Sequence, residues 1–246
     1  HTFDARADGY ARGEAIDTIA CQSNDKDAAI LALGSAVRHD GRSASLTAPN
    51  GQAQRGVLDA ALTDAQLVTA QVAALEAHGT GTALGDPIEA GAVSAVMLAQ
   101  RLSSEALAVG SLKANAGHTE PGAGLAGALR QLMQLRNGAM SPNAQLRLLN
   151  PHVGDVLHSR ACVLPVQLAA LADKEQHIGG LSSFGYSGTI AHTVLAMSRS
   201  SGAEARSLRT RVVLYRRTLF QWRVVPSSTV VRHTAAVRAS VKADVV

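Results

Sequence analysis

Leu107-Ala-Val-Gly-Ser-Leu-Lys-Ala-Asn-Ala-Gly-His118 combines a short apolar run with two ionisable side chains. Its first six residues predict a buried strand, because a short apolar run bounded by turn signals is typical of strands inside a protein. Lys113 and His118 follow this strand. The next segment, residues 119–138, begins with a threonine and a proline two residues later and predicts a helix. A strand followed directly by a helix indicates an α/β protein.

The same alternation extends in both directions along the chain. The sequence predicts strands and turns over residues 2–46 with a hairpin or loop at 23–27, a helix from Gly51 to about Ala65, a strand at 67–76, a helix at 86–101, a loop at 141–154, and a strand pair at 178–184 and 189–196. Asp86 is expected to cap its helix, because Asp is a favoured N-cap and the following Pro87 is tolerated in a first turn. The pattern therefore predicts an α/β fold with a mixed sheet.

A second string, Glu76-Ala-His-Gly-Thr-Gly-Thr-Ala-Leu-Gly-Asp86, surrounds His78 with glycines and small residues. Glycine lets the backbone come close to a ligand. Imidazole N–H and ammonium groups stabilise developing negative charge strongly where water is excluded. A lone histidine is more often a structural residue. His78 and His118 together, with Lys113 close to the second, indicate a site for a carbonyl oxygen that becomes an enolate.

Five ordered strings resemble the β-ketoacyl synthase (ketosynthase) family, specifically the C-terminal portion of the condensing domain in a type I-like polyketide synthase more than in a fatty acid synthase. They are Phe3-Asp-Ala-Arg-Ala-Asp-Gly-Tyr-Ala-Arg-Gly-Glu14, Gly41-Arg-Ser-Ala-Ser-Leu-Thr-Ala-Pro-Asn-Gly51, the two histidine strings, and Gly180-Leu-Ser-Ser-Phe-Gly-Tyr-Ser-Gly-Thr-Ile-Ala-His192. The resemblance covers roughly residues 2 to 197, and five motifs in one order make chance agreement a poor explanation.

The resemblance implies a thiolase-like α/β fold, in which two similar halves with mixed sheets and flanking helices sandwich buried helices. Residues 1–197 would form a partial ketosynthase domain, with the tail of the N-terminal half at about 1–46 and the C-terminal half at about 47–197. Residues 198–246 would be a basic linker after the ketosynthase or a disordered tail. From Arg199 onward this segment holds ten Lys and Arg against two acidic residues, a net charge of +8.

The family reaction is a decarboxylative Claisen condensation between an acyl group on a cysteine and a malonyl thioester. By motif match, His78 and His118 hold the malonyl carbonyl and stabilise the enolate, and Lys113 tunes the local charge. The resemblance also implies that Thr80 and Thr82 hydrogen-bond the pantetheine arm and that Glu120 is a partner for Lys113. It further implies a gating and oxyanion loop at Phe184, Gly185 and Tyr186. Tyr186 replaces the family's usual Phe and Ile190 its usual Asn, so the rigidity of this loop is in question.

The family's nucleophilic cysteine lies N-terminal to the string that begins at Phe3, so the isolated chain is expected to be inactive in condensation. Cys21 follows that string and is expected to be a strand cysteine. The implied partners are an acyl carrier protein, the N-terminal half of the ketosynthase and, in the full-length form, a second copy. No cofactor is expected on the chain itself, since substrates travel on the phosphopantetheine of a carrier protein or on CoA. The alternative is a non-catalytic ketosynthase-like docking module or a truncated relic.

Composition excludes several other classes. The 246 residues are 46% hydrophobic but only 17% charged, which suggests extensive buried surface. No apolar run approaches the length of a membrane span, the histidines lack metal-ligand spacing, and aromatics at 3% argue against nucleic-acid stacking. Two cysteines without a disulfide pattern fit a reducing compartment, here cytoplasm or plastid.

Overall fold

The structure is a computed structural model that describes residues 1–21, 30–41, 48–172 and 174–198. The predicted hairpin at 23–27 and almost all of the predicted tail at 198–246 lie outside these residues. The helices are α1 (Gly51–Asp64), α2 (Gly85–Met97), α3 (Lys113–Ala116), α4 (Ala123–Asn137) and α5 (Pro151–Leu157), with single 3-10 turns at Thr69–Gln71, Ser103–Glu105 and Glu120–Gly122. The strands are β1 (Ile30–His39), β2 (Ala74–Glu76), β3 (Leu107–Gly110), β4 (Ala139–Met140), β5 (Cys162–Val163), β6 (Ala169–Ala170), β7 (Gln176–Phe184) and β8 (Thr189–Ser198).

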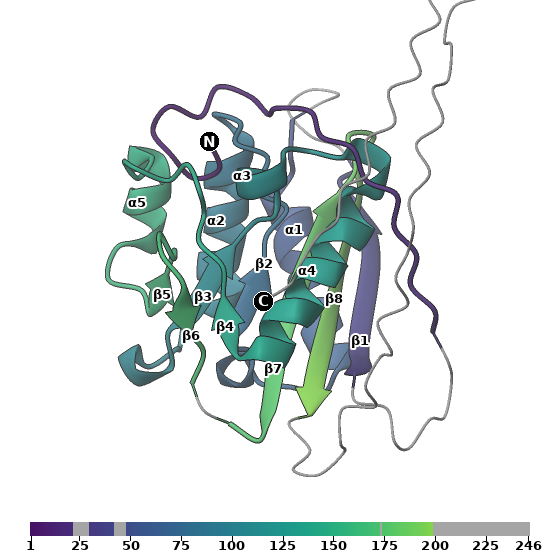
Figure 1. The fold of residues 1–246 in the computed structure, drawn as a ribbon. Helices are drawn as coiled ribbons and strands as arrows, with labels where there is room; N and C mark the ends of the chain where they lie inside the picture. The colour runs from purple at the N-terminus through teal and green to yellow at the C-terminus, as the bar shows by residue number, and fades with distance from the viewer. Residues whose placement is uncertain (22–29, 42–47, 173, 199–246) are drawn as a thin grey trace, which may run out of the picture. The chain divides into compact units, whose positions relative to one another are not determined.

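Six strands form one mixed sheet in the order β1-β8-β7-β2-β3-β5 (Figure 1). β7, β2, β3 and β5 are parallel, whereas β8 pairs antiparallel with both β7 and β1. Helices α1 and α2 cover one face and α4 covers the other, so the central strands lie between two helical layers. The α/β fold with a mixed sheet is therefore confirmed.

Several predicted elements form where the sequence predicts them. Asn50 caps α1 by accepting hydrogen bonds from the N–H groups of Gln52 and Ala53. Gly138 ends α4 in the left-handed conformation at φ 60°, as a glycine after a helix commonly does. The strand pair near the C-terminus is an antiparallel hairpin in which Phe184 pairs with Ile190.

Other predictions were wrong in detail. Asp86 does not cap α2, which begins at Gly85; its carboxylate instead accepts the N–H groups of Phe3 and Gly81. Only Ala74–Glu76 of the expected strand at 67–76 is extended in the sheet. The expected loop at 141–154 ends earlier, because Asn150 caps a helix that starts at Pro151. An Asn-Pro pair is a start signal for a helix as well as a turn signal.

The larger apolar core lies on the α1 and α2 face and contains Leu58, Leu75 and Met97, each almost fully buried. Strand β1 and the end of α1 pack closely at Gly34, because any side chain there would clash with the backbone of Ala65. On the other side of the sheet, α4 buries its inward residues but leaves three large apolar side chains exposed, which together form the α4 apolar stripe (Leu125, Leu129 and Met133).

A buried polar network joins α4 to the sheet. It begins with an ion pair between Glu76 and Arg130 and continues through Ser141, Gln134 and Gln131 back to the carbonyl oxygen of Ala74. The second carboxylate oxygen of Glu76 accepts the N–H of Leu112 at 2.6 Å. Each member has a partner, which is the condition under which buried polar groups are tolerated.

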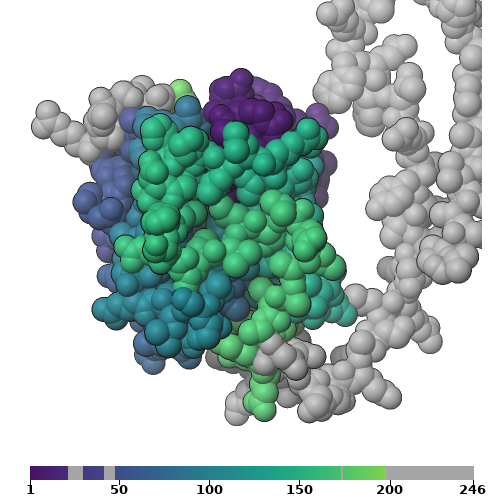
Figure 2. All heavy atoms as spheres, turned by 90° about the vertical axis from the view of Figure 1, so that its left-hand side faces the viewer, coloured from purple at the N-terminus to yellow at the C-terminus, as the bar shows by residue number. Residues whose placement is uncertain are grey.

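The N-terminal segment, residues 1–13, lies over the carboxyl ends of the parallel strands. Asp4 is fully buried, pairs with Arg6 at 2.7 Å, and accepts the N–H groups of Arg147 and Leu148. These donors, the Arg6 hydrogen bond first among them, hold the pKa of Asp4 well below its usual value. Figure 2 shows this segment at the surface against parts of the chain that come much later in sequence.

Acid is expected to destabilise the fold through His192. This side chain is almost fully buried on β8, with Nδ1 3.0 Å from the Ser182 hydroxyl, and burial lowers its pKa to about 4. In the unfolded chain the pKa of His192 has its ordinary value near 6.5, so on acidification the unfolded chain is protonated at a higher pH than the folded one. The stability that comes from the neutral, buried His192 is therefore complete above about pH 6.5 and falls as the pH drops towards 4. The free energy of unfolding should lose up to ~1.4 kcal/mol per pH unit in this window.

The role of His192 in acid destabilisation is checked by comparing the wild type with His192→Leu, whose side chain cannot titrate. Urea unfolding of both proteins between about pH 4 and pH 7 should show a shallower slope for the variant. Equal slopes would remove His192 as the cause of acid lability in this window, because the lowered pKa of Asp4 means that its contribution is lost only at lower pH.

Candidate active site

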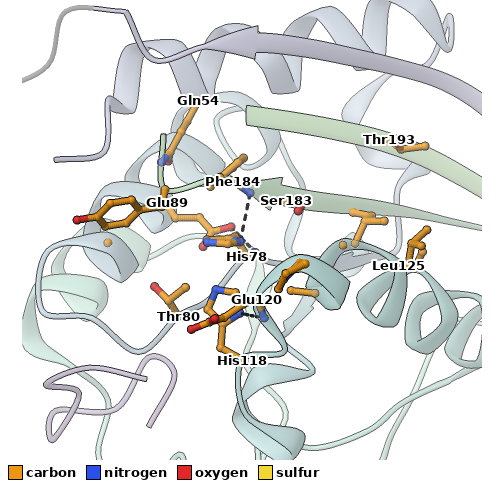
Figure 3. A pocket seen from close by; sticks show the side chains of 18 of the residues that line it. Gln54, His78, Thr80, Glu89, His118, Glu120, Leu125, Ser183, Phe184 and Thr193 are labelled. Carbon is orange, nitrogen blue, oxygen red and sulfur yellow. Dashed lines mark hydrogen bonds between the residues drawn. The ribbon is translucent and has the colours of Figure 1, made fainter. Parts of the chain in front are cut away.

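The carboxyl ends of β2, β3 and β7 open into one large cavity of about 2030 Å³ (Figure 3). Its wall is shared by the N-terminal segment, the glycine-rich loop after β2, the first half of α4, and the turn between β7 and β8. Of the predicted site residues, His78, Thr80, Thr82, His118, Glu120, Phe184, Gly185 and Tyr186 line it. Segments far apart in the sequence thus meet at one edge of the sheet, where ligands of α/β proteins commonly bind.

The two histidine rings lie next to each other and extend towards the same space (Figure 3). Their centroids are 5.8 Å apart with an interplanar angle of 88°. His78 follows β2, and His118 follows the short helix α3 after β3. Because β2 and β3 are adjacent and parallel, their carboxyl ends bring the two strings together.

Backbone groups fix the tautomer of both imidazoles. The Phe184 N–H donates to Nδ1 of His78 at 3.2 Å, and the Glu120 N–H donates to Nδ1 of His118 at 2.9 Å. An acceptor nitrogen carries no proton, so each neutral ring holds its proton on Nε2. Burial, followed by the positive charge of Lys113, lowers the pKa of both histidines. The site therefore presents two neutral Nε2–H donors.

The glycine-rich loop after β2 is held by two buried carboxylates, and this role was not predicted from their positions in the sequence. Glu89 accepts the N–H groups of His78 and Gly79 at 2.7 and 2.8 Å, and burial raises its pKa to about 7. Asp86 accepts the Gly81 N–H at 3.0 Å. A signal was present: both acids lie in the first turns of the helix after the loop, where unpaired loop N–H groups need acceptors.

Lys113 is the first residue of α3 and lies near three acidic side chains. Burial lowers its pKa, while Glu76, Glu89 and Asp86 act in the opposite direction. The expected pairing with Glu120 is not found among the described residues: Glu120 forms its ion pair with Arg12 at 3.1 Å. The sequence spacing alone could not reveal Arg12, because that residue is over a hundred positions away.

Thr80 and Thr82 place their hydroxyls 3.3 Å apart, and the Thr82 hydroxyl also accepts the N–H of Gly85. Both side chains belong to the cavity wall beside the histidines. They can offer hydrogen bonds to a polar chain that enters the cavity.

Most backbone N–H groups of the turn after β7 already have an acceptor. Phe184 donates to His78, and Gly185 donates to the Thr189 carbonyl at 2.6 Å. Within the described residues, the Tyr186 N–H donates no hydrogen bond, so it can serve as an oxyanion donor. The Tyr186 side chain is 82% exposed, which means that its hydroxyl needs no buried partner. Ile190 is fully buried and paired in the hairpin, so it anchors the turn by packing.

The two cysteines differ in their surroundings. Cys21 is exposed on the cavity wall and lies outside any strand, so its expected place in a strand was wrong. Cys162 is on β5, and burial raises the pKa of its thiol to about 11, which makes it a poor nucleophile.

Metal-site and membrane-span features are both missing from the described residues. That part of the chain contains no cluster of three or more metal-ligating side chains. It also contains no helix that is long and apolar enough to cross a bilayer.

Residues 29–147 match the family described as "Beta-ketoacyl synthase, C-terminal domain". The chain is 42% identical over 200 residues to one of the phenolphthiocerol/phthiocerol polyketide synthase proteins of Mycobacterium tuberculosis, covering 78% of this chain and 11% of that protein. It is 37% identical over 213 residues to an erythronolide synthase of Saccharopolyspora erythraea, covering 84% of this chain and 6% of that protein. The chain thus spans only about a tenth or less of the length of these relatives.

Solved structures that resemble this chain are also ketosynthases. An oxazolomycin ketosynthase domain from Streptomyces albus JA3453 superposes with a TM-score of 0.72 at 28% identity, covering 82% of this chain and 37% of that one. The ketosynthase from module 6 of the bacillaene synthase of Bacillus subtilis 168 gives a TM-score of 0.63 at 31% identity, covering 69% of this chain and 31% of that one. The thiolase-like fold is confirmed, and the chain belongs to the β-ketoacyl synthase family, as the C-terminal portion of a ketosynthase domain of the polyketide synthase type.

Proposed function

We propose that this chain supplies the enolate-stabilising half of a ketosynthase that catalyses decarboxylative Claisen condensation. The observation that carries the proposal is the pair of Nε2–H donors, fixed by backbone N–H groups and directed into one cavity. Two neutral donors suit a carbonyl oxygen that gains negative charge, because preorganised donors in a site with little water stabilise such charge strongly.

The proposed step begins with a malonyl thioester whose carbonyl oxygen accepts hydrogen bonds from His78 and His118. Cleavage of the bond to the carboxyl carbon releases carbon dioxide, and the bonding electrons form the enolate. The enolate carbon attacks the acyl thioester, and the cysteine thiolate leaves. Lys113 contributes by lowering the pKa of both histidines, which keeps them neutral. In this proposal Thr80 and Thr82 donate hydrogen bonds to the pantetheine arm. The loop of Phe184, Gly185 and Tyr186 acts as the gate and supplies an oxyanion donor.

The nucleophile in this proposal is a cysteine outside the chain. Cys162 is buried with a raised pKa. Cys21 is on the cavity wall, but the family motif places the nucleophile before Phe3. The substrates would arrive on a carrier protein or CoA, with no cofactor bound by the chain itself. The relatives named above are bacterial, and another is fungal, which supports a cytoplasmic over a plastid location.

The α4 apolar stripe supports the N-terminal half of the ketosynthase as a partner. Leu125, Leu129 and Met133 are 45%, 37% and 53% exposed and share one side of the helix. Three neighbouring large apolar side chains on one helix face are typical of a surface that another element covers. Leu125 also belongs to the cavity wall, so a partner here would complete the site.

The non-catalytic alternative has less support. A docking module has no need for two histidines with fixed tautomers in one cavity. Ile190, which raised the question of a loosened loop, is packed in the core of the hairpin.

The test compares the ketosynthase that contains this chain with the isolated chain. Each is incubated with an acyl thioester donor and malonyl carrier protein, and β-ketoacyl thioester is measured by mass spectrometry. The ketosynthase should form this product and the isolated chain should not. Product from the isolated chain would refute the assignment of the nucleophile, and its absence from both would refute the condensation itself.

A further inference from the structure

The part of the N-terminal segment around Tyr10 bridges the two histidine-bearing loops. On one side of Tyr10, the Gly9 N–H donates to the Gly81 carbonyl at 2.9 Å, which ties the segment to the loop of His78. On the other side, the Ala11 carbonyl accepts the His118 N–H at 2.7 Å. The backbone of Tyr10 is therefore held at both neighbours, and its half-exposed side chain lines the cavity.

The backbone of His118 is also clamped by this segment. The Gly13 N–H donates to the His118 carbonyl at 2.9 Å, and Arg12 forms a parallel bridge with His118. The Arg12–Glu120 ion pair holds the residue whose N–H reaches Nδ1 of the ring. These contacts fix the Cα of His118 and make Nδ1 the acceptor, but the hydrogen bond to Nδ1 lasts only while the ring keeps its χ2 angle, which this one contact restrains weakly.

The Tyr10 ring supplies the missing restraint. Its centroid lies 4.8 Å from that of His118 at an interplanar angle of 55°, while His78 contacts the same imidazole edge to face at 5.8 Å. Both distances are within the range of favourable ring pairs. Within the described residues the Tyr10 hydroxyl makes no hydrogen bond, so the ring alone accounts for the contact with His118.

We propose that Tyr10 is a positioning residue for His118, whose aromatic ring holds the imidazole with Nε2–H directed into the cavity. This role rests on the function proposed above for His118. It differs from a direct catalytic role, because Tyr10 acts through the orientation of another side chain.

Two variants separate the ring from the hydroxyl. Tyr10→Phe keeps the ring and should leave the tautomer of His118 and the rate of malonyl decarboxylation within about twofold of the wild type. Tyr10→Ala removes the ring. In that variant His118 should exchange between tautomers, and kcat for decarboxylation should fall about tenfold with a smaller change in KM, because orientation errors of about 1 Å cost up to about a hundredfold in rate.

The tautomer is read by nitrogen-15 NMR of the histidine rings without substrate, and kcat and KM are measured, all on the ketosynthase that contains this chain. His78 is the internal control: Phe184 donates to its Nδ1 and also packs its ring 5.3 Å from the imidazole, so the tautomer of His78 should be unchanged in both variants. A Tyr10→Ala protein with a single Nε2–H tautomer at His118 would overturn the proposal. So would a Tyr10→Phe protein that loses as much rate as Tyr10→Ala, since the hydroxyl would then be responsible.

The NMR result does not depend on turnover. If the wild-type ketosynthase fails to decarboxylate malonyl thioesters, the proposed function fails. The comparison of ring tautomers still decides whether Tyr10 positions His118.

Discussion

Replacing His118 with phenylalanine is expected to slow malonyl decarboxylation by the ketosynthase about 100- to 1000-fold, the usual cost of losing one donor to a developing oxyanion. Phenylalanine keeps a ring between Tyr10 and His78 but removes the Nε2–H. The measurement is the release of carbon dioxide from malonyl carrier protein under single-turnover conditions. These conditions separate the chemical step from the loading of the nucleophile.

The matched control is His158→Phe, which makes the same chemical change at an exposed histidine after α5. It should retain the wild-type rate. His78→Phe should lose activity to a similar degree as His118→Phe, because the second donor acts on the same oxygen. If His118→Phe stayed within about threefold of the wild type, the two-donor arrangement would not be the source of catalysis.

The second large effect is expected on stability. Arg130→Met should lower the free energy of unfolding by about 3–5 kcal/mol, because it leaves the buried Glu76 carboxylate without its ionic partner. Burial already raises the pKa of Glu76, and Arg130 is the leading influence that opposes this shift. Urea unfolding followed by circular dichroism would measure the loss.

The double variant Glu76→Gln with Arg130→Met provides the control. Glutamine can still accept the Leu112 N–H but carries no charge, so much of the lost stability should return. A double variant that is as unstable as Arg130→Met would show that packing by the arginine stem, and not the unpaired charge, explains the loss.

The main elements and the meeting of the two histidines could be predicted from the amino-acid sequence. Apolar spacing identified α1, the start signals Thr119 and Pro121 identified α4, and strand signals identified the hairpin of β7 and β8. These elements depend on local patterns, which is why they could be predicted. The shared site of the two histidines was implied by the match of their strings to the family's motifs.

Long-range partners could not be predicted in the same way. Asp86 has the chemistry of an N-cap, yet it serves the N–H groups of Phe3 and Gly81, because the N-terminal segment crosses the glycine-rich loop. Glu120 is close to Lys113 in sequence but pairs with Arg12. In both cases a side chain that has a plausible partner nearby in sequence instead contacts the N-terminal segment. The path of that segment cannot be predicted from composition or periodicity.

The hydrogen bond from Phe184 to His78 also has a consequence for biosynthesis. The partners are 106 residues apart, and β7, which carries Phe184, is the strand that pairs with β2. During translation β2 leaves the ribosome long before β7, so the imidazole of His78 lacks its tautomer-fixing donor until the hairpin is synthesised. The first histidine of the pair to be made is thus the one whose chemistry is completed late, and a nascent chain that stops before Phe184 holds an unfinished site.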